Sequence, residues 1–170
     1  MRRVLVIGCP GAGKTIFAHR LAERLGLPLV HLDVRYWLPG WQAPAESAWR
    51  ATVGRLVADP DWVMDGHFPD TFDLRFARAD CLIWLDYARA TCLMRVLLRL
   101  WRTAGRDRAD LPAGCPESFD AKLLAYVWRF PRQQRPRVVD AIERFGSALR
   151  VLRFRRDGEA EAFLASIETA

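Results

Sequence analysis

The sequence predicts a three-layer α/β fold in which a five-stranded parallel sheet is doubly wound between helices. Short apolar runs alternate with longer helical patterns along the 170 residues, which is typical of βαβ units. A glycine-rich turn stands between the first apolar run and the first helical pattern. A chain of this length suits one domain with a substantial core, so we expect residues 1–170 to form a single domain.

The first unit is a strand, a turn and a helix. Residues 4–7, Val-Leu-Val-Ile, form a continuous apolar run that predicts a buried strand. Residues 14–25 carry apolar side chains at helical spacing. Between them, residues 8–15 match G-x-x-x-x-G-K-[ST] in full, in the strand–turn–helix order that this pattern needs. That order argues against a chance glycine turn.

The later units repeat the alternation. Each further strand is a short apolar or aromatic run, and each further helix has apolar residues three and four apart. We expect strands at 28–32, 62–64, 81–85 and 149–154, and helices at 45–58, 88–102, 119–145 and 159–168. Pro131 and Pro136 fall inside the longest helical pattern, so we expect that helix to kink or restart there. Ligands of such a sheet bind at the carboxyl ends of its strands.

Two segments do not fit the alternation. Residues 34–41 are aromatic and rich in turn residues, and residues 103–118 are polar, with two glycines and two prolines. Insertions of this length in a compact domain are usually binding loops or lids. We therefore expect an acceptor-binding insertion at about 33–60 and a lid at about 103–118.

Composition limits the function classes. Half of the residues are hydrophobic, which excludes a disordered chain, and no apolar stretch is long enough to span a membrane. The apolar run near the start breaks at Gly8, too early for a secretory signal, so we expect a cytoplasmic protein. The four cysteines are widely spaced and support neither a disulfide framework nor a zinc site.

The net charge of +6 comes from arginine, because Lys14 and Lys122 are the only lysines. Arginine is the preferred residue for bidentate recognition of phosphate, and a basic surface also attracts nucleic acid. The arginines are spread along the chain without a basic tail. This distribution favours a phosphate-handling pocket over a duplex-binding face, and DNA remains a possible partner.

The turn at 8–15 is built to hold the phosphates of a nucleotide. Its glycines let backbone N–H groups approach phosphate oxygens, and the following helix adds its partial positive charge. Lys14 is expected to lie between the β- and γ-phosphates, and the Thr15 hydroxyl to ligate Mg²⁺. We therefore expect ATP and Mg²⁺ as cofactors. The expected nucleotide contacts in the turn are Gly8, Pro10, Gly11, Ala12, Gly13, Lys14 and Thr15.

Three carboxylates follow predicted strands. Asp65 is expected to hold the Mg²⁺ shell, with Gly66 leaving room for phosphate or metal. Asp33 is a candidate to take a proton from an attacking hydroxyl, to orient the substrate or to bind metal-bound water, and a plain strand-end role is the alternative. Asp86 is expected to cap the helix that follows. His31 and His67 are expected to be hydrogen-bonded residues rather than catalysts.

Several arginines are candidates to stabilise the transferred phosphoryl group, whose negative charge is spread over its oxygens. Arg95 and Arg99 are four residues apart and share one helix face. Arg132 and Arg135 lie beyond the predicted lid, and Arg75 follows the Asp65-Gly66 turn. The hypothesis is that several of them converge on the phosphates.

These motifs, taken together, resemble the P-loop nucleoside-monophosphate-kinase-like proteins, and most closely the bacterial DNA topology modulation proteins, which are often described as adenylate-kinase-related. The resemblance covers nearly the whole chain. Besides the turn at 8–15, it rests on His-Leu-Asp at 31–33, Tyr-Trp at 36–37, Pro-Gly-Trp at 39–41, Asp-Gly at 65–66, Asp-Leu-Arg at 73–75, Arg-Ala-Asp at 78–80, Trp-Leu-Asp at 84–86, Gly-Cys-Pro-Glu at 114–117 and residues 128–135.

The resemblance implies a P-loop kinase fold with a small lid, and a role for Arg95 and Arg99 at the ATP base and phosphates. Adenylate kinases have Asp-Gly-Phe-Pro-Arg after the third strand, whereas residues 65–70 here have one extra residue and no arginine. Arg75 is the expected substitute. Asp33 resembles the acceptor-binding aspartate of shikimate- and gluconate-type kinases. The expected acceptor contacts are Asp33, Arg35, Trp37, Gly66 and Arg75.

The leading functional hypothesis is an ATP-dependent phosphotransferase that acts on a small molecule or a nucleotide, as a monomer or homodimer. The expected catalytic residues are Lys14, Asp33, Arg99, Arg132 and Arg135. The alternative is a nucleotide-dependent regulator of DNA topology with slow ATPase activity. A GTP-using switch is disfavoured because no N-K-x-D motif is present.

Overall fold

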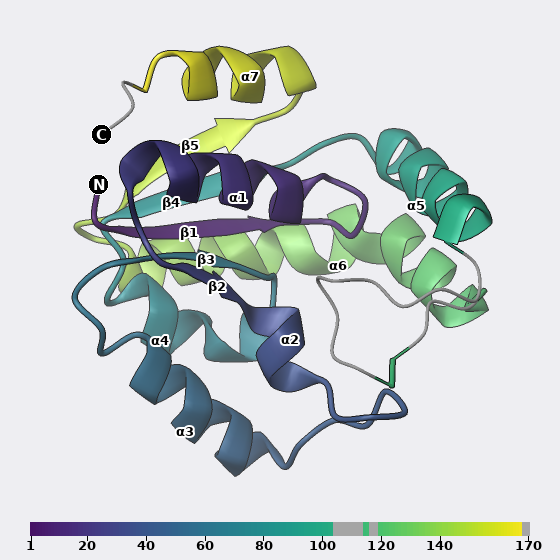
Figure 1. The fold of residues 1–170 in the computed structure, drawn as a ribbon, viewed down its shortest axis with the longest axis horizontal. Coiled ribbons are helices and arrows are strands. Elements are labelled where there is room, and N and C mark those ends of the chain that lie inside the picture. The colour runs from purple at the N-terminus through teal and green to yellow at the C-terminus, as the bar shows by residue number, and fades with distance from the viewer. Residues whose placement is uncertain (104–113, 116–118, 168–170) are drawn as a thin grey trace.

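The computed structural model of the chain describes residues 1–103, 114–115 and 119–167 (Figure 1). Its centre is a sheet of five parallel strands in the order β2-β3-β1-β4-β5. The strands are β1 (Arg3–Gly8), β2 (Leu29–His31), β3 (Trp62–Asp65), β4 (Cys81–Leu85) and β5 (Arg150–Phe154). The predicted five-stranded, doubly wound α/β fold is confirmed, and each strand lies within two residues of its predicted bounds.

The helices match the predicted alternation and add three short elements. They are α1 (Lys14–Leu25), α2 (Leu32–Tyr36), α3 (Glu46–Leu56), η1 (Pro69–Thr71), α4 (Phe72–Phe76), α5 (Arg89–Thr103), α6 (Ala121–Phe145) and α7 (Asp157–Ala165). α1 has the predicted bounds. α2, η1 and α4 were not predicted, because three to five residues are too few to show a helical period.

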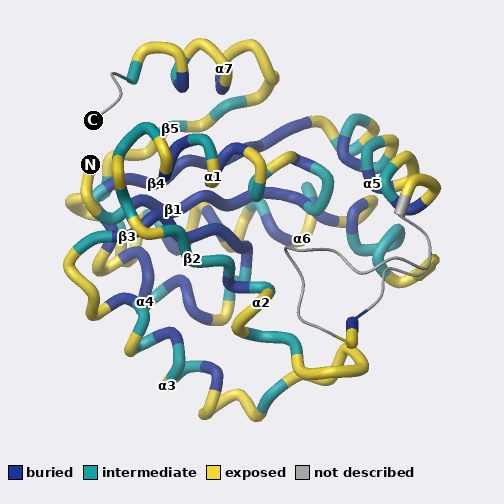
Figure 2. The backbone as a smooth tube through the Cα atoms, viewed as in Figure 1, coloured by how far each residue is buried: buried dark blue, intermediate teal, exposed yellow. Residues whose placement is uncertain are grey.

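Each face of the sheet has its own apolar core. Val4 and Val6 pack with α1, α5 and α7, whereas Leu5 and Ile7 pack with α3 and α4. In Figure 1, α1 and α7 accordingly lie on one side of the sheet, and α3 and α4 on the other. Figure 2 shows β1, β3 and β4 as the buried centre between these layers. The carboxyl ends of these buried strands position the site.

Helix α6 joins the two cores. Val127 and Phe130 belong to the first core, and Val138 and Ala141 to the second. The sequence predicted a kink or a restart at the prolines, and the restart is wrong, since α6 runs unbroken through Pro131 and Pro136. A proline has no N–H to donate to the carbonyl four residues earlier, which for Pro131 is Val127. That carbonyl lies 4.0 Å from the Sγ atom of Cys9 in the glycine-rich turn.

The predicted lid lies largely outside the described residues, which include only Gly114 and Cys115 of its inner part. These two contact the aromatic insertion that follows β2. The Gly40 amide donates to the Gly114 carbonyl at 2.8 Å, and the Cys115 thiol lies 3.3 Å from the Leu38 carbonyl. The two predicted insertions therefore meet at this point.

The four cysteines are buried free thiols. Among the described residues, no helix combines the length and the apolar character that crossing a bilayer requires. No group of three or more metal-ligating His, Cys, Asp or Glu side chains occurs in this part of the chain.

Candidate active site

The candidate site lies at the carboxyl edge of the sheet, where three strands end side by side. Parallel pairing aligns His31 of β2 with Asp65 of β3, and Asp65 with Val6 of β1. The Gly66 amide continues this pairing by donating to the Val6 carbonyl at 3.2 Å. The turn at 8–15 leaves β1 two residues further on, so it stands beside the end of β3.

The turn has the geometry of an anion-binding loop. Its backbone closes through a hydrogen bond of 3.0 Å from the Ala12 amide to the Cys9 carbonyl, and the Lys14 ammonium donates to the same carbonyl at 3.2 Å. In the part of the chain that the structure describes, no group accepts a hydrogen bond from the amides of Gly11, Gly13, Lys14 or Thr15. Free amides at a helix start, next to an ammonium, fit a bound polyphosphate.

Asp65, which is buried, and His31, which is half-buried, form a pair at the end of β3. Asp65 is 3% exposed, and its Oδ1 lies 2.7 Å from the Nδ1 of His31. The expectation that His31 is a hydrogen-bonded residue is confirmed. The pair fixes the direction of the carboxylate and leaves the second oxygen of Asp65 for another contact, which fits a role in holding metal-bound water.

Asp86 does not cap a helix, contrary to the prediction. Its buried carboxylate accepts from Nε of Arg135 at 2.7 Å and from Nε of Arg153 at 2.9 Å, and α5 begins three residues later. Arg153 also stacks on Trp84, with its guanidinium 4.4 Å from the ring centre. The carboxylate pairs with one arginine from α6 and one from β5, and it does not accept from the amides at the start of α5. Arg135, an expected catalytic residue, is therefore held at the end of β4.

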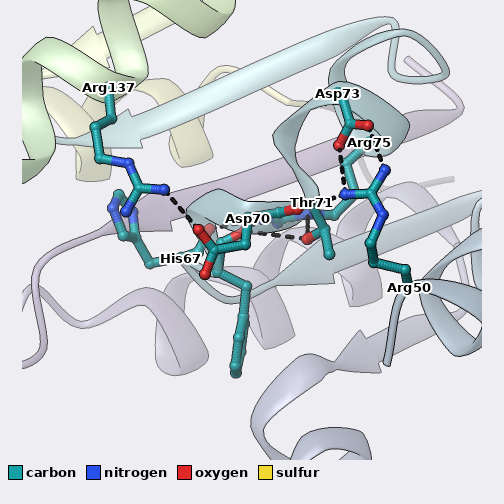
Figure 3. Close-up of polar contacts among 8 residues, drawn as sticks. Arg50, His67, Asp70, Thr71, Asp73, Arg75 and Arg137 are labelled. Carbon is teal, nitrogen blue, oxygen red and sulfur yellow. Dashed lines mark hydrogen bonds and ion pairs between the residues drawn. The ribbon is translucent and has the colours of Figure 1, made fainter. Parts of the chain in front are cut away.

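Arg75 does not reach an acceptor, and this expectation is wrong. Its side chain is fully buried under the turn that follows β3, as Figure 3 shows. The guanidinium donates to the Gly66 carbonyl at 3.0 Å, to the Phe68 carbonyl at 2.7 Å and to the Thr71 hydroxyl at 3.1 Å. Burial lowers its pKa to about 9. Because its donors are used within the turn, Arg75 shapes the site and does not contact a substrate.

Gly66 does not leave room for phosphate or metal, as the sequence had suggested. Its φ of 137° and its packing both require glycine, since a Cβ would lie 2.8 Å from the Cβ of Leu32. Its amide and its carbonyl are taken by Val6 and Arg75. Gly66 therefore lets α2 pack closely on the turn, and it is not a substrate contact.

Two ion pairs flank this turn on opposite sides, as Figure 3 shows. Arg50 of α3 donates to Asp73 at 2.5 Å, and Arg137 of α6 donates to Asp70 at 2.6 Å. Neither arginine was singled out as a site residue from the sequence.

His67 differs from the sequence expectation because neither ring nitrogen has a hydrogen-bond partner within residues 1–103, 114–115 and 119–167. The residue is 7% exposed, and its ring packs against Phe72 at 5.3 Å and Phe130 at 4.7 Å between centres. Burial, followed by the charges of Lys14 and Arg75, lowers the pKa of His67 to about 3. Because the charge of Lys14 helps to lower the pKa of His67, the ring lies near the nucleotide turn.

The acceptor residues expected after β2 lie on and next to α2. Asp33 is half-buried in α2, Arg35 is exposed, and Trp37 packs edge-on against Tyr36 at 4.8 Å. Burial raises the pKa of Tyr126 in α6 to about 12, and the charge of Asp33 adds to this effect. Asp33 is therefore near Tyr126, which adjoins the part of α6 that approaches Cys9.

The two arginines expected at the ATP base and phosphates, Arg95 and Arg99, lie on α5. Arg95 donates to Asp157 at the start of α7 at 2.5 Å and lies over the Tyr87 ring at 5.6 Å. Arg99 is half-buried one turn later. Arg132 is exposed on α6, next to the buried face that carries Phe130. Arg135 is held at the end of β4 by its contact with Asp86.

Comparison with known proteins identifies the family. The shikimate kinase of Paramagnetospirillum magneticum (strain ATCC 700264 / AMB-1) is 31% identical over 139 residues, which are 72% of this chain and 68% of that protein. The chain belongs to the shikimate kinase family. As a member of this family of P-loop kinases, it is an ATP-dependent phosphotransferase, as the sequence predicted. No family model matches the chain.

Solved structures confirm the fold of this member of the shikimate kinase family. Shikimate kinase from Acinetobacter baumannii in complex with shikimate superposes with a TM-score of 0.60 at 15% identity, covering 98% of this chain and 90% of that one. A gluconokinase from Sinorhizobium meliloti 1021 gives 0.54 at 16% identity, covering 98% and 93%. The finer resemblance to DNA topology modulation proteins gains no support from these relatives.

The role of Gly66 is tested with a matched pair of glycines. Gly66→Ala should lower the free energy of unfolding by about 2 kcal/mol or more, because the new methyl group strains a positive φ and meets Leu32. Gly54→Ala in α3, where a Cβ meets nothing within 4 Å, should raise it by about 0.5–1 kcal/mol. Chemical denaturation measures both, and equal effects would contradict the packing account.

The structural role of Arg75 gives a second stability prediction. Arg75→Met should lower the free energy of unfolding by about 3 kcal/mol or more, because buried carbonyls of the turn lose their donor. Arg55→Met, at an exposed position on α3, should change it by less than about 0.5 kcal/mol. An Arg75→Met variant of normal stability with a weakened acceptor KM would instead restore the substrate role.

Proposed function

We propose that the chain transfers the γ-phosphoryl group of Mg·ATP to a hydroxyl group of a small molecule bound between Asp33 and the turn after β3. The observation that carries the proposal is the nucleotide turn, whose free amides and Lys14 ammonium lie at the carboxyl edge beside Asp65 and α2. A cytoplasmic location, where ATP is abundant, belongs to the same proposal.

The donor side consists of the turn and α1. The amides of the turn and the start of α1 bind phosphate oxygens, and Lys14 leaves the Cys9 carbonyl to neutralise the transferring group. Thr15 and Asp65 would hold Mg²⁺, Asp65 through a water molecule and with its carboxylate kept in place by His31. The metal would supply positive charge that stabilises the transferring phosphoryl group. Arg95, Arg99 and Arg132 supply further positive charge near the nucleotide.

The acceptor side consists of α2 and the loop that follows it. Asp33 orients the attacking hydroxyl and accepts its proton, since its carboxylate lies at the carboxyl edge. Arg35 and Trp37 contact the rest of the acceptor. Arg135 keeps Asp86 and α6 in place behind the nucleotide turn and contributes positive charge without leaving its carboxylate.

The relatives suggest the chemical class of the acceptor. One is a shikimate kinase and another a gluconokinase, so both are named for small hydroxy acids. A nucleoside monophosphate is disfavoured, because the arginine expected to grip its phosphate is buried under the turn. No observation favours the DNA-topology alternative. The direct test is a coupled assay of ADP release over shikimate, gluconate, uncharged polyols and AMP, and activity with AMP alone would overturn the proposal.

The donor assignment predicts the effect of removing Lys14. Lys14→Ala should reduce kcat by at least about a hundredfold with any acceptor, because the transferred charge loses its nearest ammonium. The matched control is Lys122→Ala, which removes the only other lysine, exposed at the start of α6, and should leave kcat unchanged. Near-normal turnover in Lys14→Ala would refute the assignment.

The acceptor assignment predicts a split between catalysis and nucleotide binding. Asp33→Asn should lower kcat by roughly 10²- to 10⁴-fold, because the amide cannot take the proton of the hydroxyl, while the KM for ATP should stay within about threefold. Asp59→Asn, an isosteric change at an exposed position, should alter neither. Equal losses of ATP affinity and turnover would indicate a metal or structural role for Asp33.

A further inference from the structure

Two buried polar side chains lie at the carboxyl edge with unused hydrogen-bonding atoms. His67 and Gln134 are each 7% exposed. Among the residues that the structure describes, none is a hydrogen-bond partner of either ring nitrogen of His67 or of the Oε1 atom of Gln134. Buried polar groups without partners cost stability, and native proteins keep few of them. A ligand that supplies the missing partners would account for both residues.

The position of the two side chains places them within the kinase site. His67 directly follows Gly66, whose amide is bonded to the strand that leads into the nucleotide turn. Its ring lies near Arg137 and Asp70, as Figure 3 shows. Gln134 follows Phe130, which touches the His67 ring, by one helical turn. The pair thus lies between the nucleotide turn and the wall formed by α6.

Gln134 is also the one polar residue in the buried face of α6. The other members of that face, spaced three and four residues apart, are Val127, Phe130, Val138 and Ala141. Gln134 is close enough to His67 to favour the protonated ring, yet no atom of the two side chains meets in hydrogen-bond geometry. The two residues therefore do not satisfy one another.

The unused atoms select the kind of group that can bind. A neutral imidazole offers one donor and one acceptor, and an amide oxygen only accepts. A hydroxyl group can accept from the ring and donate to the amide oxygen at the same time. A carboxylate or a phosphate can only accept, so it would face the amide oxygen without a proton between them.

We propose that His67 and Gln134 together bind one hydroxyl group of the acceptor, which accepts from the His67 ring and donates to Oε1 of Gln134. The inference rests on the proposed function and narrows it, because it makes the acceptor a compound with a second hydroxyl group besides the one that is phosphorylated. Such a pair determines specificity, since an analogue without that hydroxyl leaves both buried groups unpaired.

The first test removes the amide without changing the side-chain size. Gln134→Leu should raise the KM for the acceptor by about 3- to 30-fold, while the KM for ATP stays within about twofold. Gln133→Leu makes the same change at the neighbouring exposed position and should alter neither constant. The assay is coupled ADP release with shikimate, gluconate, myo-inositol and D-sorbitol. An unchanged acceptor KM in Gln134→Leu and in His67→Phe would overturn the inference and leave the proposed function intact.

Thermal stability separates recognition from a structural role. Because Oε1 of Gln134 has no partner in the described part of the chain, Gln134→Leu should keep or raise the Tm. A lower Tm together with an unchanged acceptor KM would show that the amide serves the core alone.

A binding measurement covers the case in which no compound is phosphorylated. That result would count against the proposed function, and the ¹⁵N signals of the His67 ring would then test the inference separately. Addition of a polyol from the panel should shift these signals in the wild type and not in Gln134→Leu. Signals that no compound moves would indicate a fixed water at most, and would overturn the inference.

Discussion

The pairing of β1 with β3 on one side and with β4 on the other is the constraint on which the site depends. Main-chain hydrogen bonds fix Val6 opposite Asp65 and Gly8 opposite Leu85, so β1 and β4 end at one level and β3 ends two residues earlier. The nucleotide turn, the Asp65–His31 pair and Asp86 consequently meet at one edge. A shift of one residue in either pairing would turn Asp65 or Asp86 to the opposite face of the sheet.

Buried charges hold this edge in shape. Asp86 joins β4 to α6 and β5 through Arg135 and Arg153, and Arg75 ties the turn after β3 to its own carbonyls. Breaking such buried groups costs more than breaking surface ion pairs, because an unpaired buried charge remains. The acidic and basic residues nearest to the nucleotide turn are therefore as much a scaffold as a set of catalysts.

The sequence was sufficient for the fold and for locating the glycine-rich turn, and less so for the contacts of the residues after β3 and β4. The turn at 8–15 could be assigned because its spacing is itself the geometry that phosphates need. Arg75 and Gly66 were misassigned because a sequence does not show that a guanidinium points into its own turn, or that Leu32 fills the space beside a glycine. The prediction that Asp86 caps a helix was wrong for a similar reason, since its partner Arg153 is 67 residues away.

Gln134 carried a signal that could have been found, because it interrupts a regular apolar stripe in the sequence of α6. His67 carried none, since its burial depends on Phe72 and Phe130 from different elements. The pairing of Arg137 with Asp70 likewise depends on how α6 crosses the turn. Contacts between distant elements were the part that local patterns could not supply.

Helix α6 connects three parts of the carboxyl edge. It contacts the nucleotide turn where Val127 approaches Cys9, the end of β4 through Arg135, and Asp70 in the turn after β3 through Arg137. These contacts belong to a single helix that is unbroken through two prolines. The Val127 carbonyl is the one that Pro131 leaves without an N–H donor, so the gap in the hydrogen bonds of the helix coincides with the place where α6 meets the nucleotide turn.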